Sequence, residues 1–472
     1  MAGVLAFGSL QAANDLPELG EAASEELSLA AEKRIGQQIM NDIRWREPSY
    51  LDDPEIEGYL NQLGGRLAAA CSDPGIGFYF FPINDPTINA FAMPGGFIGV
   101  HTGLILAAQS ESELASVLAH EIAHVTQRHI ARQLQREKQM SMASLLVMGL
   151  ALLAARSNTQ MASAAMASSQ AGSIQAQLSF SRQFEREADR MGFETLQKAG
   201  FDVRAMSGFF QRLLRATQVY ENNAPVYLRT HPLNVERISD MQNREQRVRY
   251  KQVPDGLDFH FVRAKLRALK GNVGDAVKDF QVLVQDRKYP SEAASRYGLA
   301  IALLRQRDWA GAEQQVLAAK KLRAASPMLE RAYAESRIGQ GDAIGGLKIY
   351  QEAIARHPHN AALVYAYGDA LIAQQRFNES LKLAEEQLRF APRDIRLHHL
   401  LARSYAALGR ASQNHRIMAE SYALQGQTLA AIEQLELAQH APDANFYEQS
   451  VIDARLRELK RRRLEEEKEK YR

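Results

Sequence analysis

The second half of the 472-residue chain repeats itself with a period of 34 residues. Small side chains recur at this interval at Ala300, Ala334, Gly368 and Ala402. A second set of small or polar side chains follows 12 residues later each time, at Ala312, Gly346, Ser380 and Asn414. Such spacing lets two antiparallel helices cross closely, because a larger side chain would not fit between them. The pattern therefore predicts stacked helix pairs over residues 257–443.

A period of 34 with small residues 12 apart is typical of tetratricopeptide repeats. Repeats of this kind stack into an all-α solenoid, whose concave surface binds peptide segments. A generic helical bundle is the alternative, but four steps in phase favour the solenoid. The sequence that follows, residues 444–472, is dominated by blocks of like charge and is expected to form a charged helical tail.

The charge balance excludes one large class of partners. The chain has 57 Lys and Arg against 55 Asp and Glu, a net charge of +2, so it has no electrostatic footprint for nucleic acid. Its single cysteine, Cys71, rules out an intrachain disulfide. Packing, a bound metal or both must therefore stabilise the fold.

Two apolar segments bear on localisation. Residues 1–13 are apolar, rich in small residues and uncharged, which resembles a secretory signal without its basic end. A frayed apolar amino terminus is the alternative. Residues 142–155 carry no charge but are shorter than the roughly 18–20 residues that a spanning helix needs. A buried helix followed by a loop is favoured there, and peripheral membrane contact through residues 142–177 is the functional alternative.

The region before the repeats, residues 14–250, predicts an α+β fold with a small sheet. Helices are expected over residues 54–67, 110–136 and 179–198, and short strands over residues 78–83, 88–92 and 96–101. Ser110 and Glu113 form a capping-box pattern at the start of the second helix. Pro94 and Gly95 mark a turn between the last two strands.

The second of these helices contains the motif His120-Glu121-Ile-Ala-His124. Two histidines one turn apart share a face, and both imidazoles can bind one Zn²⁺. Glu121 lies beside them and can reach a water near the metal without being a ligand itself. A carboxylate in this position can accept the proton of an attacking water and later protonate a leaving amine. The motif predicts a metalloprotease site with one Zn²⁺ per chain.

A catalytic zinc needs a third protein ligand. The helix over residues 179–198 offers Glu185, Glu187 and Asp189, of which Glu185 and Asp189 are four residues apart and share a face. The economical assignment makes Glu185 the ligand and Asp189 the acceptor that orients a zinc-bound imidazole. Glu187 points to the other side and suits solvent or a salt bridge. Taken alone, the charged residues of this helix fit a solvent-exposed face equally well.

Together, H-E-I-A-H, the later E-R-E-A-D and the upstream N-A-F-A-M-P-G-G resemble the M48 family of zinc metallopeptidases. The resemblance implies a gluzincin-like fold, zinc on His120, His124 and Glu185, and catalysis by Glu121. With the repeats that follow, the arrangement is similar to that of exported, repeat-bearing members of Gram-negative bacteria, and it therefore implies a periplasmic protein. Their role is quality control of outer-membrane β-barrels, which they degrade when stalled or help to assemble.

The resemblance also assigns roles to residues outside the zinc motif. Residues 89–100, beginning at Asn89, match an active-site edge strand that takes up extended substrate, although a plain core hairpin fits the composition too. His231, in T-H-P-L, matches a family histidine that can approach the zinc. It is expected either as a fourth ligand that keeps the enzyme latent, as a transition-state donor, or as a simple loop residue. Arg237 matches a family arginine that anchors this loop or binds an oxyanion or carboxylate. His101 and His129 lack a supporting pattern and are expected to be structural.

Two hypotheses of function follow. The first is a zinc endopeptidase that acts on unfolded or misassembled outer-membrane proteins, with the repeats docking substrate or the β-barrel assembly machinery. The second is a chaperone-like assembly adaptor whose protease is mostly latent.

Overall fold

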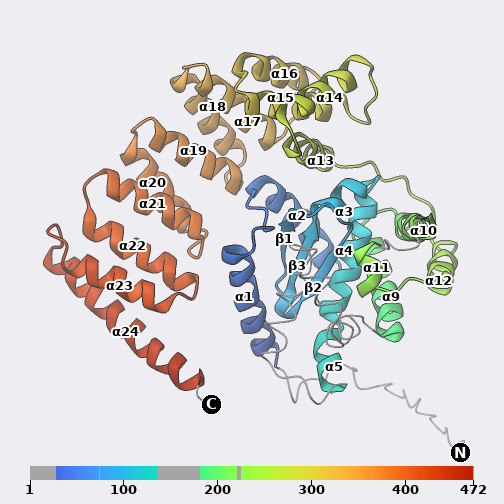
Figure 1. Ribbon diagram of the computed structural model, residues 1–472, viewed down its shortest axis with the longest axis horizontal. Helices are drawn as coiled ribbons and strands as arrows, with labels where there is room; N and C mark the ends of the chain where they lie inside the picture. The colour runs from blue at the N-terminus through green and yellow to red at the C-terminus, as the bar shows by residue number, and fades with distance from the viewer. Residues whose placement is uncertain (1–27, 74, 137–180, 220–224, 471–472) are drawn as a thin grey trace, which may run out of the picture.

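The computed structural model describes residues 28–73, 75–136, 181–219 and 225–470 (Figure 1). The expected signal segment 1–13 and the segment 142–177 lie outside these ranges. The amino-terminal part consists of α1 (Leu29–Arg46), α2 (Pro54–Ala68), β1 (Tyr79–Ile83), β2 (Ala90–Met93), η2 (Pro94–Gly96), β3 (Phe97–His101), α3 (Thr102–Ala107), α4 (Glu111–Thr126), α5 (His129–Arg136), α9 (Arg182–Lys198), α10 (Arg204–Val219), α11 (Val226–Thr230) and α12 (Val235–Glu245). None of the helices in the described ranges combines the length and apolarity needed to cross a membrane.

The three strands lie close to their predicted positions and form one small sheet in the order β1-β3-β2. β3 pairs with β1 in parallel and with β2 in antiparallel orientation, so β2 is an edge strand of this sheet. The turn between β2 and β3 needs glycine, because Gly95 and Gly96 have φ angles of 75° and 86°. The turn predicted at Pro94 and Gly95 is thus confirmed.

The prediction of one continuous helix over residues 110–136 is wrong, because the structure contains two helices there, α4 and α5. Ser110 caps α4 by accepting a hydrogen bond from the backbone N–H of Glu113 at 3.2 Å. The break comes at Arg128, whose φ of 51° is incompatible with a continuing right-handed helix. The Arg128 side chain binds Glu32 of α1 at 2.6 Å, which holds the break in place.

The repeat array confirms the predicted solenoid. Its helices are α13 (Leu257–Leu269), α14 (Val273–Gln285), α15 (Glu292–Gln306), α16 (Trp309–Lys321), α17 (Pro327–Gly339), α18 (Ala343–Arg356), α19 (Ala361–Ala373), α20 (Phe377–Leu388), α21 (Ile395–Ala407), α22 (Ala411–Leu424), α23 (Thr428–Gln439) and α24 (Phe446–Lys470). The small residues do lie where helices cross. A Cβ atom added to Gly368 would come within 2.3 Å of the Leu400 side chain.

The segment predicted as a charged tail, residues 444–472, contains α24, which packs against the repeats more closely than the charged composition indicates. Ile452, Leu456 and Leu459 of α24 are buried in an apolar cluster together with residues of α22 and α23. The first half of α24 therefore covers the end of the solenoid, which a repeat array requires for solubility.

The two parts of the molecule share one continuous apolar core, which runs from Ile56 in α2 to Ala332 in α17. A buried ionic cluster adds to this junction: Lys265 of α13 binds Asp53 at 2.5 Å and also Glu55 at the start of α2. Arg331 of α17 binds the same Glu55 at 3.0 Å. The first repeats are thus packed firmly against the amino-terminal part.

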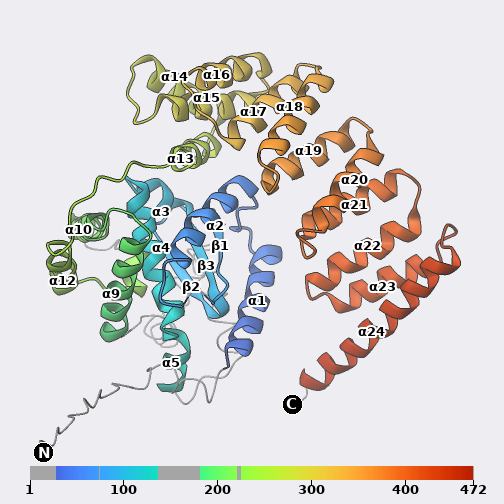
Figure 2. The same cartoon turned by 180° about the vertical axis from the view of Figure 1, so that it is seen from behind.

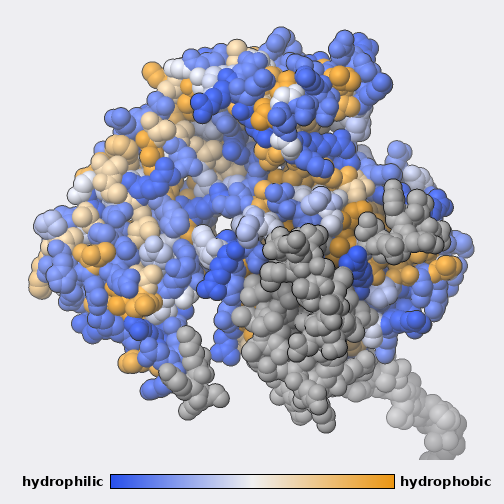
Figure 3. Space-filling model, in the orientation of Figure 1, coloured by the Kyte–Doolittle hydropathy of each residue, from blue (hydrophilic) through white to orange (hydrophobic). Residues whose placement is uncertain are grey.

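The array then curves around one side of the amino-terminal part, as Figures 1 and 2 show. Arg396 of α21 binds Asp52, and the side chain of Asn41 in α1 donates to the C=O of Gln425 at 3.3 Å. In the space-filling view, an open gap lies between the later repeats and the amino-terminal part (Figure 3). These second contacts are polar, in contrast to the shared core at the first repeats, and between the two lies the packing of α19 against α2.

Candidate metal centre

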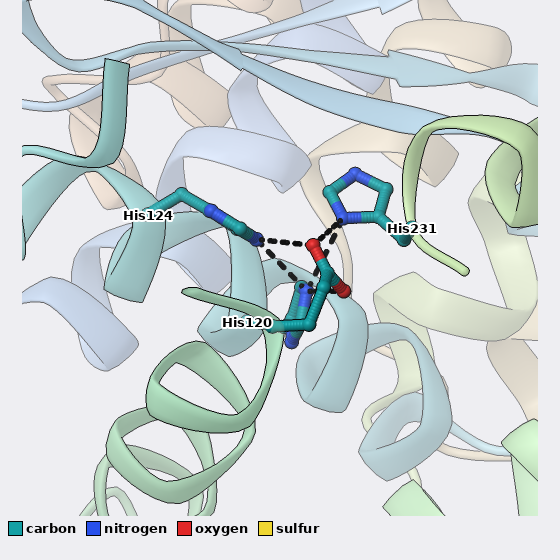
Figure 4. Close-up of side chains that lie close together, drawn as sticks. His120, His124 and His231 are labelled. Carbon is teal, nitrogen blue, oxygen red and sulfur yellow. Dashed lines mark hydrogen bonds and ion pairs between the residues drawn. The ribbon is translucent and has the colours of Figure 1, made fainter. Parts of the chain in front are cut away.

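Three helices bring four buried side chains together. His120 and His124 lie on α4, whose opposite face packs into the core through Leu118 and Ile122. Glu185 comes from α9, which begins after the cap residue Ser181, and His231 lies at the end of α11. Figure 4 shows the three imidazoles converging on one carboxylate. One potential ligand atom from each of the four side chains lies within 4.8 Å of the others.

Four of the distances between these atoms are close to those of a tetrahedral metal site. The Nε2 atoms of His120 and His124 are 3.0 Å apart, and His124 Nε2 lies 3.4 Å from Glu185 Oε1. His231 Nδ1 lies 3.0 Å from the same oxygen and 3.4 Å from His120 Nε2. A tetrahedral zinc with bonds of 2.0–2.1 Å separates its ligand atoms by about 3.4 Å. Three imidazole nitrogens and a carboxylate oxygen are also the donors that such a metal prefers.

Electrostatics favours the ligand form of two of these groups. Burial alone would raise the pKa of Glu185, but His231, His120 and His124 hold it well below the usual range of a carboxyl group. Burial lowers the pKa of His124 well below its ordinary value, which keeps that imidazole neutral. Burial also disfavours the charged form of His120, but Asp189 and Glu185 together outweigh this effect and raise the pKa of His120 to about 9. A metal must therefore compete with a proton on His120.

A second layer of contacts orients the two motif histidines. Asp189 Oδ1 lies 3.1 Å from His120 Nδ1. On the other ring, His129 Nδ1 lies 2.9 Å from His124 Nδ1, and Glu187 stands behind His129 at 3.3 Å from its Nε2. Groups in such positions fix the orientation of metal-binding imidazoles.

His129 is a residue that the sequence reasoning missed. In one continuous helix it would lie about 140° around the axis from His124 and could not contact it. The break at Arg128 turns the chain so that the two rings meet. Glu187, expected to face solvent or a salt bridge, forms the salt bridge with Arg132 at 3.1 Å.

Arg237 joins the carboxylates to the loop that carries His231. Its guanidinium binds Asp189 through two hydrogen bonds, of 2.6 and 2.8 Å, and binds Glu185 Oε2 at 2.7 Å. A further hydrogen bond of 2.7 Å goes to the C=O of Pro232. Because the side chain is only 3% exposed, these interactions replace all of its solvation. The geometry favours loop anchoring over oxyanion binding among the expected roles of Arg237.

Glu121 lies beside the four-residue group without belonging to it. It is fully buried, and neither carboxylate oxygen has a hydrogen-bond partner of normal geometry within the described residues. The Nε2 atom of His231 lies 3.5 Å from Glu121 Oε1. Burial raises the pKa of Glu121, and His231, His120 and the backbone of Ala92 in β2 oppose that rise. A buried carboxylate with free acceptor capacity is suited to take up a proton.

Asn89 lies outside this group, at the start of the edge strand. It is 2% exposed, and its Nδ2 atom lies 3.4 Å from His101 Nε2. The preceding C=O, of Ile88, accepts a hydrogen bond from the backbone N–H of Tyr227 in α11 at 3.2 Å. The strand that follows Asn89 packs against α4, which carries Glu121, and the residue before Asn89 contacts the segment that carries His231.

Comparison with known proteins gives matches to both parts of the chain. The model of peptidase family M48 matches residues 54–245, and a tetratricopeptide repeat model matches residues 337–404. The beta-barrel assembly-enhancing protease of Escherichia coli K12 is 32% identical over 469 residues, covering 97% of this chain and 94% of its own. A Vibrio cholerae protein with a name of the same kind is 33% identical, over 94% of this chain and 92% of its own. Among solved structures, the TPR protein YrrB covers 39% of this chain and 93% of its own, with 14% identity and a TM-score of 0.29.

Proposed function

The chain belongs to peptidase family M48, and from this premise we propose that it is a zinc-dependent endopeptidase of the bacterial envelope. The observation that carries the proposal is the buried group of His120, His124, Glu185 and His231 with Glu121 next to it. A zinc ion held there would lower the pKa of a water molecule and polarise the scissile carbonyl. Glu121 would accept the proton of that water and deliver one to the leaving amine.

The contact of Asp189 with His120 makes the proposed zinc binding testable. Replacing Asp189 with asparagine should weaken zinc binding by about 10–100-fold, because an amide cannot match a carboxylate as the acceptor for His120 Nδ1. Competition with a chelator of known affinity measures the effect. The control is Asp240→Asn on α12, where the carboxylate is 49% exposed and pairs with Arg244. Equal zinc affinity in the wild type and Asp189→Asn would contradict the role of Asp189.

The proposed substrates are unfolded or misassembled outer-membrane β-barrel proteins, in the periplasm. The names of the relatives from E. coli and Vibrio cholerae support this assignment, and so does the near-neutral charge, which suits polypeptide better than a polyanion. The repeats would dock these substrates or the β-barrel assembly machinery, because solenoids of this kind present extended binding surfaces. Peripheral membrane contact through residues 142–177 remains part of the proposal.

His231 is proposed as an inhibitory fourth ligand. A catalytic zinc keeps one position open for water, whereas four protein ligands close the site. His231 Nδ1 is as near to Glu185 as the ligand geometry requires, and its Nε2 faces Glu121. Loop movement would then be needed before catalysis.

The replacement His231→Ala tests this assignment. It should raise the basal cleavage of unfolded β-casein severalfold, because it opens the fourth position without touching the other ligands. The matched control is His359→Ala in the repeat array, which should leave the rate unchanged. A lower rate in His231→Ala would instead indicate a transition-state donor.

The closed arrangement also favours the second hypothesis, a chaperone-like adaptor whose protease is rarely used. A deletion strain with an envelope-assembly defect separates the two. Full rescue by a Glu121→Gln chain would favour the adaptor, and failure of rescue with normal protein levels would favour the protease.

A further inference from the structure

β2 presents a free backbone edge beside Glu121. The N–H of His101 in β3 donates to the C=O of Asn89 at 3.0 Å, and the backbone groups of successive residues in a strand point in alternate directions. The N–H and C=O groups of Ile88, Ala90 and Ala92 therefore face away from β3. No other strand of the described residues pairs with this side of β2. An extended peptide can add itself to such an edge through main-chain hydrogen bonds.

Each end of this free edge meets another part of the site. At one end, β2 packs against α4, the helix that carries Glu121. At the other end, the C=O of Ile88 accepts the hydrogen bond from the N–H of Tyr227. The open stretch is thus centred on Ala90, and α11 covers the next pairing position along the strand.

Tyr227 and His231 are linked through α11. They are four residues apart, at the two ends of the short helix α11, and the N–H of His231 donates to the C=O of Tyr227 at 2.8 Å. Their rings are stacked, with centroids 4.5 Å apart and planes at 24°. Tyr227 is buried, and no described residue is within hydrogen-bond reach of its hydroxyl, so packing rather than polar contacts fixes its side chain. A displacement of Tyr227 from Ile88 would therefore carry His231 away from Glu185 and Glu121.

We propose that the hydrogen bond between Tyr227 and Ile88 makes the enzyme selective for long, extended chains. A short peptide pairs with Ala90 alone and leaves α11 and His231 in place. A chain long enough to reach Ile88 donates a backbone hydrogen bond to its C=O in place of Tyr227. It thereby displaces α11 and withdraws His231 from the metal centre. The preferred substrate is then an unfolded segment that extends well beyond the scissile bond toward Ile88. This inference rests on the proposed function and adds to it the signal that opens the site.

Two series of quenched fluorescent peptides test the proposal on the zinc-loaded full chain. All peptides share one central sequence and are lengthened one residue at a time, at the amino end in one series and at the carboxyl end in the other. We expect kcat/KM to rise by about tenfold at a threshold length in one series only, because α11 covers one end of the edge. In His231→Ala the step should vanish, since short peptides no longer meet a closed site. A gradual rise in both series, or a step that persists in His231→Ala, overturns the proposal.

A second measurement does not depend on catalysis. Hydrogen exchange of zinc-loaded Glu121→Gln is followed by mass spectrometry with the longest and the shortest peptide of the active series, or of both series if none is cleaved. The long peptide should slow exchange in residues 88–92 and speed it in 225–231, whereas the short peptide should affect 88–92 alone. Unchanged exchange in 225–231 with the long peptide overturns the inference. If exchange changes as expected but no peptide is cleaved by the wild type or His231→Ala, the proposed function fails and the coupling stands.

Discussion

Replacing Glu121 with glutamine is expected to lower kcat for peptide cleavage by about 10²–10⁴-fold, the range that general acid–base groups contribute. Glutamine has nearly the same shape as the glutamate but cannot accept the proton of the attacking water. The carboxylate lies outside the group of four ligand atoms, and neither of its oxygens has a hydrogen-bond partner of normal geometry among the described residues. Zinc content and thermal stability should therefore be unchanged, and both are measured on the same preparation as the rate.

The matched control is Glu194→Gln, the same chemical change on α9 outside the site. It should leave kcat at the wild-type value. Cleavage by Glu121→Gln that persists and is sensitive to a chelator would rule out Glu121 as the proton acceptor. Loss of both cleavage and zinc would instead show that Glu121 contributes to metal binding.

Replacing Arg237 with methionine should destabilise the protein by about 3–5 kcal/mol, the usual result of removing one partner from a buried ion pair. The methionine would leave Asp189 and Glu185 without their shared cation in a site that excludes water. It would also release the C=O of Pro232 and so loosen the loop that carries His231. Denaturant-induced unfolding of the zinc-free protein measures the change without a contribution from the metal.

Two further variants serve as comparisons for Arg237→Met. Arg237→Lys keeps the charge but loses the paired hydrogen bonds to Asp189, so it should lie between the wild type and methionine. Arg186→Met removes an arginine whose ion pair with Glu236 is more than half exposed, and should cost less than about 1 kcal/mol. Similar losses in Arg186→Met and Arg237→Met would contradict the buried network.

The helices, strands and ligand candidates were predictable because their signals are local. The helical spacing of His120 and His124, and of Glu185 and Asp189, can be read within one turn, and the period of 34 can be read without a structure. The contact between His129 and His124 could not be predicted, because it depends on a positive φ at Arg128, a residue type that rarely adopts one. The cluster of Lys265 with Asp53 and Glu55 joins residues more than 200 positions apart, and no local pattern encodes such a pairing.

The shared core between α2 and the first repeats also fixes where the molecule can bend. The core that joins the two parts ends at Ala332 in α17, and the helices beyond it pack into separate clusters. The first repeats and α19, which also packs against α2, therefore form a rigid base, while the repeats beyond α19 can swing once the few polar contacts near Asn41 and Asp52 open. A polypeptide bound to the later repeats would be tethered to the metal centre at a length set by the array. Docking would then determine which stretch of a long chain can reach Glu121.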